Sequence, residues 1–145
     1  MKINTTAPSN SITEAQEELI GEFGFFEDWM DRYQYLIDLG KQLSDFPEDW
    51  KIQEYKIEGC QSQVWIKPAF EDGRLFFQGI SDSAIVSGLI AVVTRVYSGR
   101  TPEEIKTTPP EFINKIGFTE HLSPTRSNGL HAMLDSIFGY ADLAG

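Results

Sequence analysis

The sequence predicts an α+β fold, in which a small antiparallel sheet of three strands packs against several helices. Apolar residues recur at helical spacing in the first third of the chain and again after residue 80. Between these regions lie short alternating segments with a turn signal, a pattern typical of an antiparallel meander. The length of 145 residues fits one compact domain.

The N-terminal part of the chain is predicted to contain a flexible lead-in segment followed by a first helix. Residues 1–12 are rich in Asn, Ser and Thr and are expected to be flexible, so the single domain is placed at 13–145. Thr13 is the candidate cap of the first helix, and Glu17 follows in its early turns, where the helix dipole favours negative charge.

A second helix and a loop are expected next. From Asp28 to Leu43 apolar residues recur at helical spacing with charged residues between them, which predicts a helix on the surface of a core. The polar stretch from Ser44 to Gln53 contains Pro47 and is expected to be a loop, since a helix does not easily run into proline.

Three strands are expected in succession. The alternation from Tyr55 to Glu58 predicts a short first strand, and a second is predicted at about Val64 to Phe70. Glu71-Asp72-Gly73 is a turn signal, after which Arg74 to Gly79 is expected to return as the third strand.

The remaining elements are helices. The mostly apolar segment from Ser83 to Tyr97 predicts a buried central helix that ends at Gly99, where a left-handed residue is favoured. Thr101-Pro102-Glu103-Glu104 is a capping box with proline at the first helical position. Ser123-Pro124 is expected to open the last helix.

Composition narrows the classes of function. The formal charge of −10 works against nucleic-acid binding, which depends on neutralising phosphates with Lys and Arg. The longest apolar stretch, Ala84 to Val93, falls well short of the roughly 20 residues needed to cross a bilayer, and the start of the chain is polar. We therefore expect no nucleic acid, no membrane and a cytoplasmic location.

The single cysteine, Cys60, limits the chemistry. It excludes an intramolecular disulfide and a multi-thiolate metal site, while His121 and His131 lack a recognisable ligand spacing. Cys60 follows Gly59 in a polar segment, so it is expected on a loop. Glu58 is expected to raise the thiol pKa, which favours a thiol that reacts when a partner docks.

Three blocks of sequence resemble the SufE family of sulfur-acceptor proteins, which includes the CsdE branch. The first block is Gly59-Cys60-Gln61-Ser62-Gln63-Val64-Trp65. The second contains Ser81-Asp82 and the apolar helix that follows, and the third is the segment from His121 to Leu130. With the helix around Tyr33 to Gly40, the resemblance covers about residues 28 to 140.

The resemblance implies a specific activity. Family members accept sulfane sulfur from the persulfide of a cysteine desulfurase, here SufS- or CsdA-like, on the cysteine that corresponds to Cys60, and deliver it to a SufB-type scaffold complex. Pyridoxal phosphate belongs to that desulfurase, so this chain needs no cofactor and no metal of its own. The family fold is similar to that of U-type iron–sulfur scaffolds. Which desulfurase is the partner, and whether the chain is a monomer or a homodimer, stays open.

The supporting residues have two interpretations each. Asp82 is either a helix cap or part of the cysteine loop's surroundings, and Arg126 either pairs with a surface acid or stabilises an anionic sulfur. His121 is expected to be structural rather than a base. The loop residues contact a partner or fix the loop; these are Gly59, Gln61, Ser62 and Gln63.

Two rival functions remain at the level of the sequence. A thiol enzyme would pair Cys60 with His121 or His131 and would act on a small substrate by itself. A pure interaction module would stimulate a desulfurase by binding, with Cys60 only structural.

Overall fold

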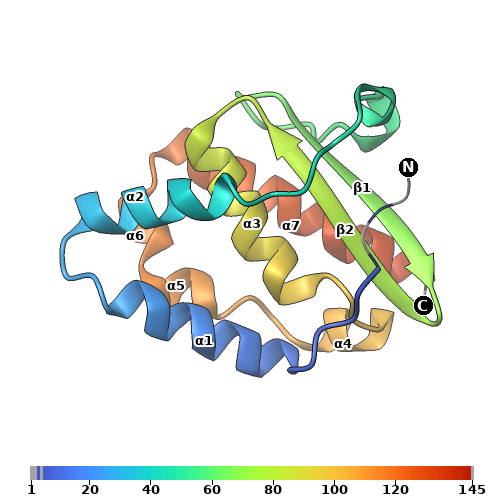
Figure 1. Ribbon diagram of the computed structural model, residues 1–145, viewed down its shortest axis with the longest axis horizontal. Coiled ribbons are helices and arrows are strands. Elements are labelled where there is room, and N and C mark those ends of the chain that lie inside the picture. Colours follow the sequence, from blue (N-terminus) through green and yellow to red (C-terminus); the bar gives the residue numbers. More distant parts are fainter. Residues whose placement is uncertain (1–2, 4, 145) are drawn as a thin grey trace.

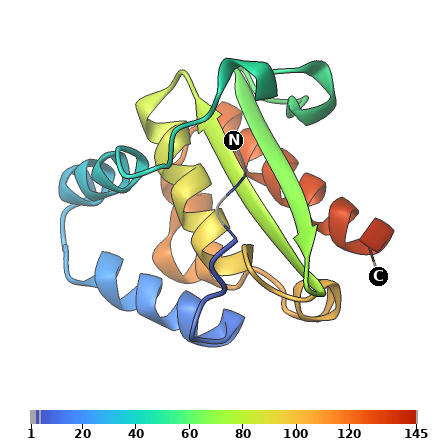
Figure 2. The same ribbon diagram turned by 45° about the vertical axis from the view of Figure 1, so that its right-hand side comes forward.

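The computed structural model describes residue 3 and residues 5–144. Helix α3 (Ala84–Tyr97) lies at the centre, with α1 (Ile12–Gly24) and α2 (Trp29–Gly40) on one side and the sheet and α7 (Pro124–Ala144) on the other (Figures 1 and 2). The described part contains seven α-helices and one antiparallel sheet, so the predicted α+β class is confirmed.

Helix α1 (Ile12–Gly24) begins before the expected start. Its cap is Ser11, whose hydroxyl accepts the N–H of Glu14, while the Glu14 carboxylate accepts the N–H of Ser11. The prediction of Thr13 as the cap was therefore wrong: Thr13 lies inside the first turn. Ser11 and Glu14 have the spacing of a capping box, and this spacing outweighs the weaker single-residue signal at Thr13.

Helix α2 (Trp29–Gly40) begins at its cap Asp28 and crosses α3 at close range. Glycines on both helices permit this approach. A Cβ on Gly88 would lie 2.3 Å from the carbonyl oxygen of Leu36, and one on Gly40 would lie 2.6 Å from the backbone nitrogen of Gly88. The two backbones are therefore in direct contact at the crossing.

The sheet has two strands, β1 (Val64–Glu71) and β2 (Arg74–Ser81), so the prediction of three strands was wrong. Of the segment expected as a first strand, Tyr55 ends the 3-10 turn Gln53–Tyr55, and Lys56 pairs with Trp65 of β1 in a single isolated bridge. Only Lys56 and Ile57 lie between the 3-10 turn and the turn at Glu58 and Gly59, so too few extended residues remain to form a ladder.

The hairpin between the strands has the two-residue loop expected from its sequence. Asp72 and Gly73 have φ angles of 53° and 78°, as a loop with two left-handed residues requires. The outer edge of β1 carries Pro68, which is paired with Phe77. The N–H of Phe77 points away from β1 to the hydroxyl of Ser98, so the nitrogen of Pro68 faces the free edge.

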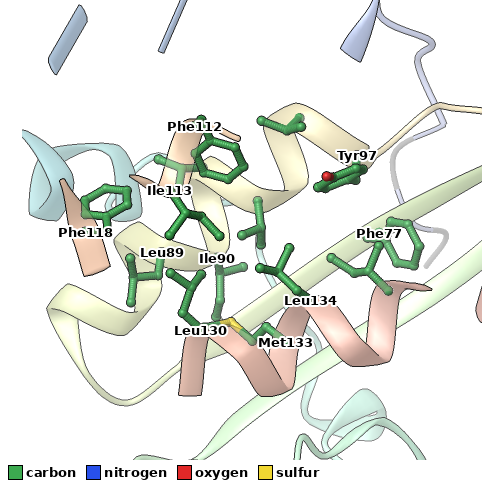
Figure 3. Packing of buried hydrophobic residues seen from close by; sticks show 14 of the residues in the cluster. Phe77, Leu89, Ile90, Tyr97, Phe112, Ile113, Phe118, Leu130, Met133 and Leu134 are labelled. Carbon is green, nitrogen blue, oxygen red and sulfur yellow. The ribbon is translucent and has the colours of Figure 1, made fainter. Parts of the chain in front are cut away.

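The core lies between α3 and the elements around it. Ser83 caps α3 by accepting the N–H of Val86, and Gly99 ends the helix region with a φ of 81°, as predicted. Figure 3 shows side chains of α3 facing those of α7 (Pro124–Ala144) across the core. The residues labelled on these two helices are Leu89, Ile90, Tyr97, Leu130, Met133 and Leu134.

Short helices close the remaining side. These are the predicted α4 (Pro102–Thr107) with its capping box, α5 (Phe112–Ile116) and α6 (Phe118–His121). The buried Gln16 of α1 donates to the carbonyl of Pro109 and accepts the N–H of Phe112, so it joins α1 to the start of α5. No helix of the described residues is long and apolar enough to span a membrane.

A buried arginine ties the N-terminal segment to this body. Arg100 is only 1% exposed, and its guanidinium donates to the carbonyl of Val96 and to the backbone and side-chain oxygens of Asn10. Burial lowers the pKa of Arg100. Ile3 is also buried. The flexibility of the lead-in and the domain boundary at residue 13 remain predictions.

Candidate functional site

Cys60 lies on the loop that enters β1, and its side chain turns inward. It is half-buried, with its thiol directed at the carbonyl oxygen of Gly129 on α7 at an S–O distance of 3.7 Å. Gly59 makes the turn that brings the thiol there: its φ of 88° favours glycine, and a Cβ at this position would lie 3.6 Å from Ala132. The loop is thus laid against α7.

A pocket of about 290 Å³ extends from the thiol. Val86, Gly129 and Met133 contribute the non-polar part of its lining, beside Cys60. The other lining residues are polar, with several hydroxyls and one guanidinium but no carboxylate; they are Gln61, Ser62, Ser83, Ser123, Thr125 and Arg126. The first turns of α3 and α7 both contribute to the lining, and helix N-termini favour negative charge.

Asp82 holds the far end of the cysteine loop. Its carboxylate accepts the N–H of Gln63 at 3.1 Å, and its own N–H donates to the carbonyl of Gln63 at 3.3 Å. Ser83, not Asp82, provides the side-chain cap of α3. Of the two interpretations of Asp82, the structure therefore places it with the loop.

Arg126 lies at the pocket wall in the first turn of α7. Its backbone N–H donates to the hydroxyl of Ser123 at 3.3 Å. Across residues 3 and 5–144 its guanidinium has no ion-pair partner, and the two interpretations of Arg126 remain predictions. A cation is thus available to an anion in the pocket.

The histidines do not line this pocket. The ring of His121 stacks on Trp29 with ring centroids 4.1 Å apart, and the carbonyl of His121 accepts the hydroxyl of Tyr33. His131 is exposed on α7 and also lies outside the lining. The structure therefore places no histidine beside Cys60 that could act as its base.

The pKa of the Cys60 thiol lies above its ordinary value. Burial of the side chain disfavours the thiolate, and the negative charge of Glu58 adds to the effect. Because the thiolate is the nucleophile, the free protein holds Cys60 mostly as an unreactive neutral thiol at neutral pH.

The pH dependence of thiol labelling tests this state. A raised pKa leaves less thiolate at neutral pH, so the rate of alkylation by iodoacetamide should rise with pH through a midpoint above that of the unfolded chain. Glu58→Gln removes one of the two causes and should move the midpoint down. Stopped-flow or mass-spectrometric labelling from pH 6 to pH 10 measures it, with Glu54→Gln as the matched control. A wild-type midpoint at or below that of the unfolded chain would contradict the assignment.

The sequence did not predict all of the residues that line the pocket. Ser83, Ser123, Thr125 and Gly129 line it but were not among the predicted site residues. Ser83 and Ser123 carried a signal, because each precedes a predicted helix start, and residues before such starts often point their hydroxyls toward the helix N-terminus. Gly129 had no such signal in the sequence, because it lines the pocket only through the way α7 packs against the cysteine loop.

No group of three or more His, Cys, Asp or Glu side chains in the described part of the chain is placed to hold a metal ion. A cluster would need more protein ligands than Cys60 can supply.

Fold and site together define an α+β protein with one protected thiol in a hydroxyl-lined pocket. The family model described as "SufE: Fe-S metabolism associated domain" matches residues 17–141. An uncharacterized SufE-like protein of Rhizobium meliloti (strain 1021) is 41% identical over 131 residues, covering 87% of this chain and 94% of the relative. One of Rhizobium etli is 42% identical over 126 residues, with coverage of 83% and 85%. The chain belongs to the SufE family, and is thereby associated with Fe–S metabolism.

The comparison with solved structures supports the fold and nothing further. The solution structure of a hypothetical protein from Thermus thermophilus superposes with a TM-score of 0.74 over 96% of this chain and 98% of that one, at 18% identity. The similarity to U-type scaffolds remains a prediction.

Proposed function

We propose that this chain is a sulfur carrier that accepts sulfane sulfur on Cys60 from a cysteine desulfurase, stimulates that desulfurase, and passes the sulfur to a SufB-type scaffold complex. The observation that carries the proposal is the single, half-buried thiol in the lining of a largely polar pocket of about 290 Å³. Family membership supports the link to iron–sulfur metabolism. The carrier does not turn over alone, and pyridoxal phosphate belongs to the donor.

The transfer is an exchange between two sulfur atoms. The thiolate of Cys60 attacks the outer sulfur of the donor's persulfide; a new S–S bond forms while the donor's S–S bond breaks, and the donor cysteine leaves as a thiolate. The departing thiolate takes up the proton that Cys60 gives away. No electrons are gained or lost overall, so the step needs no further oxidant or reductant.

The pocket suits the product better than the free thiol. A persulfide adds one sulfur beyond Sγ, and Cys60 shares the lining of a pocket of about 290 Å³ with hydroxyl-bearing residues and Arg126. These donors, together with the N-terminal ends of α3 and α7, favour an anionic terminal sulfur. Arg126 would hold the loaded sulfur, while the pocket walls shield it from small thiols in the cytoplasm.

Loading requires the cysteine loop to move or the pocket to open. Cys60 is directed at Gly129 in the resting state, and Asp82 holds the loop's other end. A partner that displaces the loop removes the burial that keeps the pKa of Cys60 high. Docking would therefore supply both access and reactivity, which fits a thiol that is unreactive alone.

Intact-protein mass spectrometry tests the proposal. The chain is incubated with a cysteine desulfurase and cysteine under non-reducing conditions, beside Cys60→Ser. We expect the wild type to gain the mass of one or more sulfur atoms and to lose this added mass on reduction. Cys60→Ser should gain no sulfur. If desulfurase turnover is stimulated equally by both proteins and no sulfur is loaded, the chain is a binding activator instead. Turnover of a small substrate by the free protein would favour the thiol enzyme.

A further inference from the structure

The turn between α1 and α2 exposes two large apolar side chains. Phe25 is 82% exposed and Met30 is 74% exposed. We refer to the surface formed by Phe25, Glu27, Met30 and Asp31 as the α1–α2 tip. Single exposed apolar residues are common, but two that stand at the two ends of one short turn are more typical of an interaction site.

Hydrogen bonds and one ring contact brace the backbone of the α1–α2 tip. Arg32 donates from Nε to the carbonyl of Phe26 at 2.7 Å and from Nη1 to the carbonyl of Ile116 at 3.0 Å. The ring of Phe26 packs edge-to-face on that of Phe25, with centroids 5.4 Å apart. Asp28 fixes the start of α2 by accepting the N–H of Met30. A partner would therefore meet a turn whose backbone is already fixed, which lowers the entropy cost of binding.

The surroundings of the tip are strongly acidic. From Ile12 to Gly40 the chain has eight carboxylates and one cation, Arg32, which gives this unit a charge of −7 within the total of −10. Arg32 is engaged with backbone carbonyls and with the ring of Trp29. Glu27 and Asp31 are exposed and have no ion-pair partner in the described part of the chain. The charge around the tip thus favours a basic partner.

The tip is connected to the wall of the Cys60 pocket. Trp29, beside Met30 at the start of α2, stacks on His121 at the end of α6, and Ser123 two residues later lines the pocket. Figure 1 shows the start of α2 next to α6, with the chain continuing into α7. A protein that covers the pocket mouth can therefore extend over α6 to the tip.

We propose that the α1–α2 tip is a second docking contact for the cysteine desulfurase, which would receive Phe25 and Met30 in an apolar recess bordered by Lys or Arg. This inference rests on the proposed function. A second copy of this chain is a poor occupant, because two strongly acidic surfaces would face each other. An aromatic anchor and an adaptable methionine are residue types that contribute strongly at interfaces.

Binding measurements on the desulfurase test the tip. The double variant Phe25→Ser/Met30→Ser should raise the Kd, measured by isothermal titration calorimetry, by about tenfold or more, since anchor residues often carry such effects. Phe70→Ser is the matched control: Phe70 is 57% exposed near the far end of the hairpin, and its replacement should change the Kd by less than about twofold. Circular dichroism checks that both variants are folded.

The acidic rim is tested through its salt dependence. Glu27→Gln/Asp31→Asn should slow association and flatten the dependence of the association rate on salt, because rim charges act mainly on encounter. A Kd for the Phe25/Met30 variant that stays close to the wild-type value would overturn the inference. So would self-association of the wild type that the variant abolishes, since the occupant would then be a second copy.

The outcomes separate this inference from the proposed function. If wild-type Cys60 gains sulfur at saturating desulfurase while the tip variant binds normally, the docking contact is wrong and the carrier function stands. If the tip variant binds weakly and still loads fully at saturating desulfurase, both stand. If wild-type Cys60 is never loaded, the carrier function itself has failed.

Discussion

Replacing Gly88 with alanine is expected to destabilise the fold by about 3 kcal/mol or more. The new Cβ would lie 2.3 Å from the carbonyl oxygen and 2.7 Å from the Cγ of Leu36. Backbone atoms cannot rotate out of the way, so α2 and α3 would have to separate at their closest crossing, where Leu36 is fully buried. This cost exceeds the gain of about 1 kcal/mol that alanine brings to a helix interior.

The control is the same substitution without the clash. Gly21 lies in α1, and a Cβ there would have nothing within 4 Å, so Gly21→Ala should stabilise the protein by about 0.5–1 kcal/mol. Urea unfolding followed by circular dichroism gives both free energies of unfolding. If the two variants shift stability in the same direction, the close crossing of α2 and α3 is not as described.

Replacing Gly129 with valine should drive Cys60 out of its resting position. A Cβ at Gly129 would meet Cys60 and nothing else within 4 Å, at 3.4 Å from its Sγ, and valine adds two methyl groups beyond that. Overpacking of this kind typically costs about 1–3 kcal/mol, and movement of the loop relieves it. We expect iodoacetamide to label Cys60 roughly tenfold faster at neutral pH, because the displaced thiol is exposed and its pKa falls toward the ordinary value.

Gly139→Val is the matched control on the same helix. Gly139 also lies in α7, and a Cβ there would have nothing within 4 Å. The helix propensity of valine is then the same in both variants, and only the contact with Cys60 differs. Equal labelling rates in the two variants would show that Cys60 does not rest against Gly129.

Local signals predicted most of the helices. The capping box at Thr101 and the start of α7 at Pro124 follow from residues adjacent in the sequence, and the structure confirms both. The first of the three expected strands was wrongly predicted, because the alternation over Tyr55 to Glu58 is too short to decide between a strand and a 3-10 turn. Long-range pairing decides that choice, and here it supplies only one bridge.

The sequence predicted the thiol of the site but not the residues that surround it. Cys60 stands out because it is the only cysteine and lies in a distinctive motif. The contact between Asp82 and Gln63 and the approach of Gly129 to the thiol join residues 19 and 69 positions apart in the chain. Such distances are set by the packing of β2, α3 and α7, which a single sequence does not specify. His121 stacks on Trp29, a contact that a single sequence does not specify.

Pro68 affects the tendency of the protein to aggregate at high concentration. A hairpin with an open edge offers a template on which strands of other molecules can add, the first step toward fibrils and insoluble sheets. At Pro68 the free edge of β1 lacks a donor, so an incoming strand would lose a bond in the middle of its ladder. The neighbouring Lys67 adds a charge that such a strand would have to accommodate. The chain can therefore keep a sheet of only two strands and still resist aggregation.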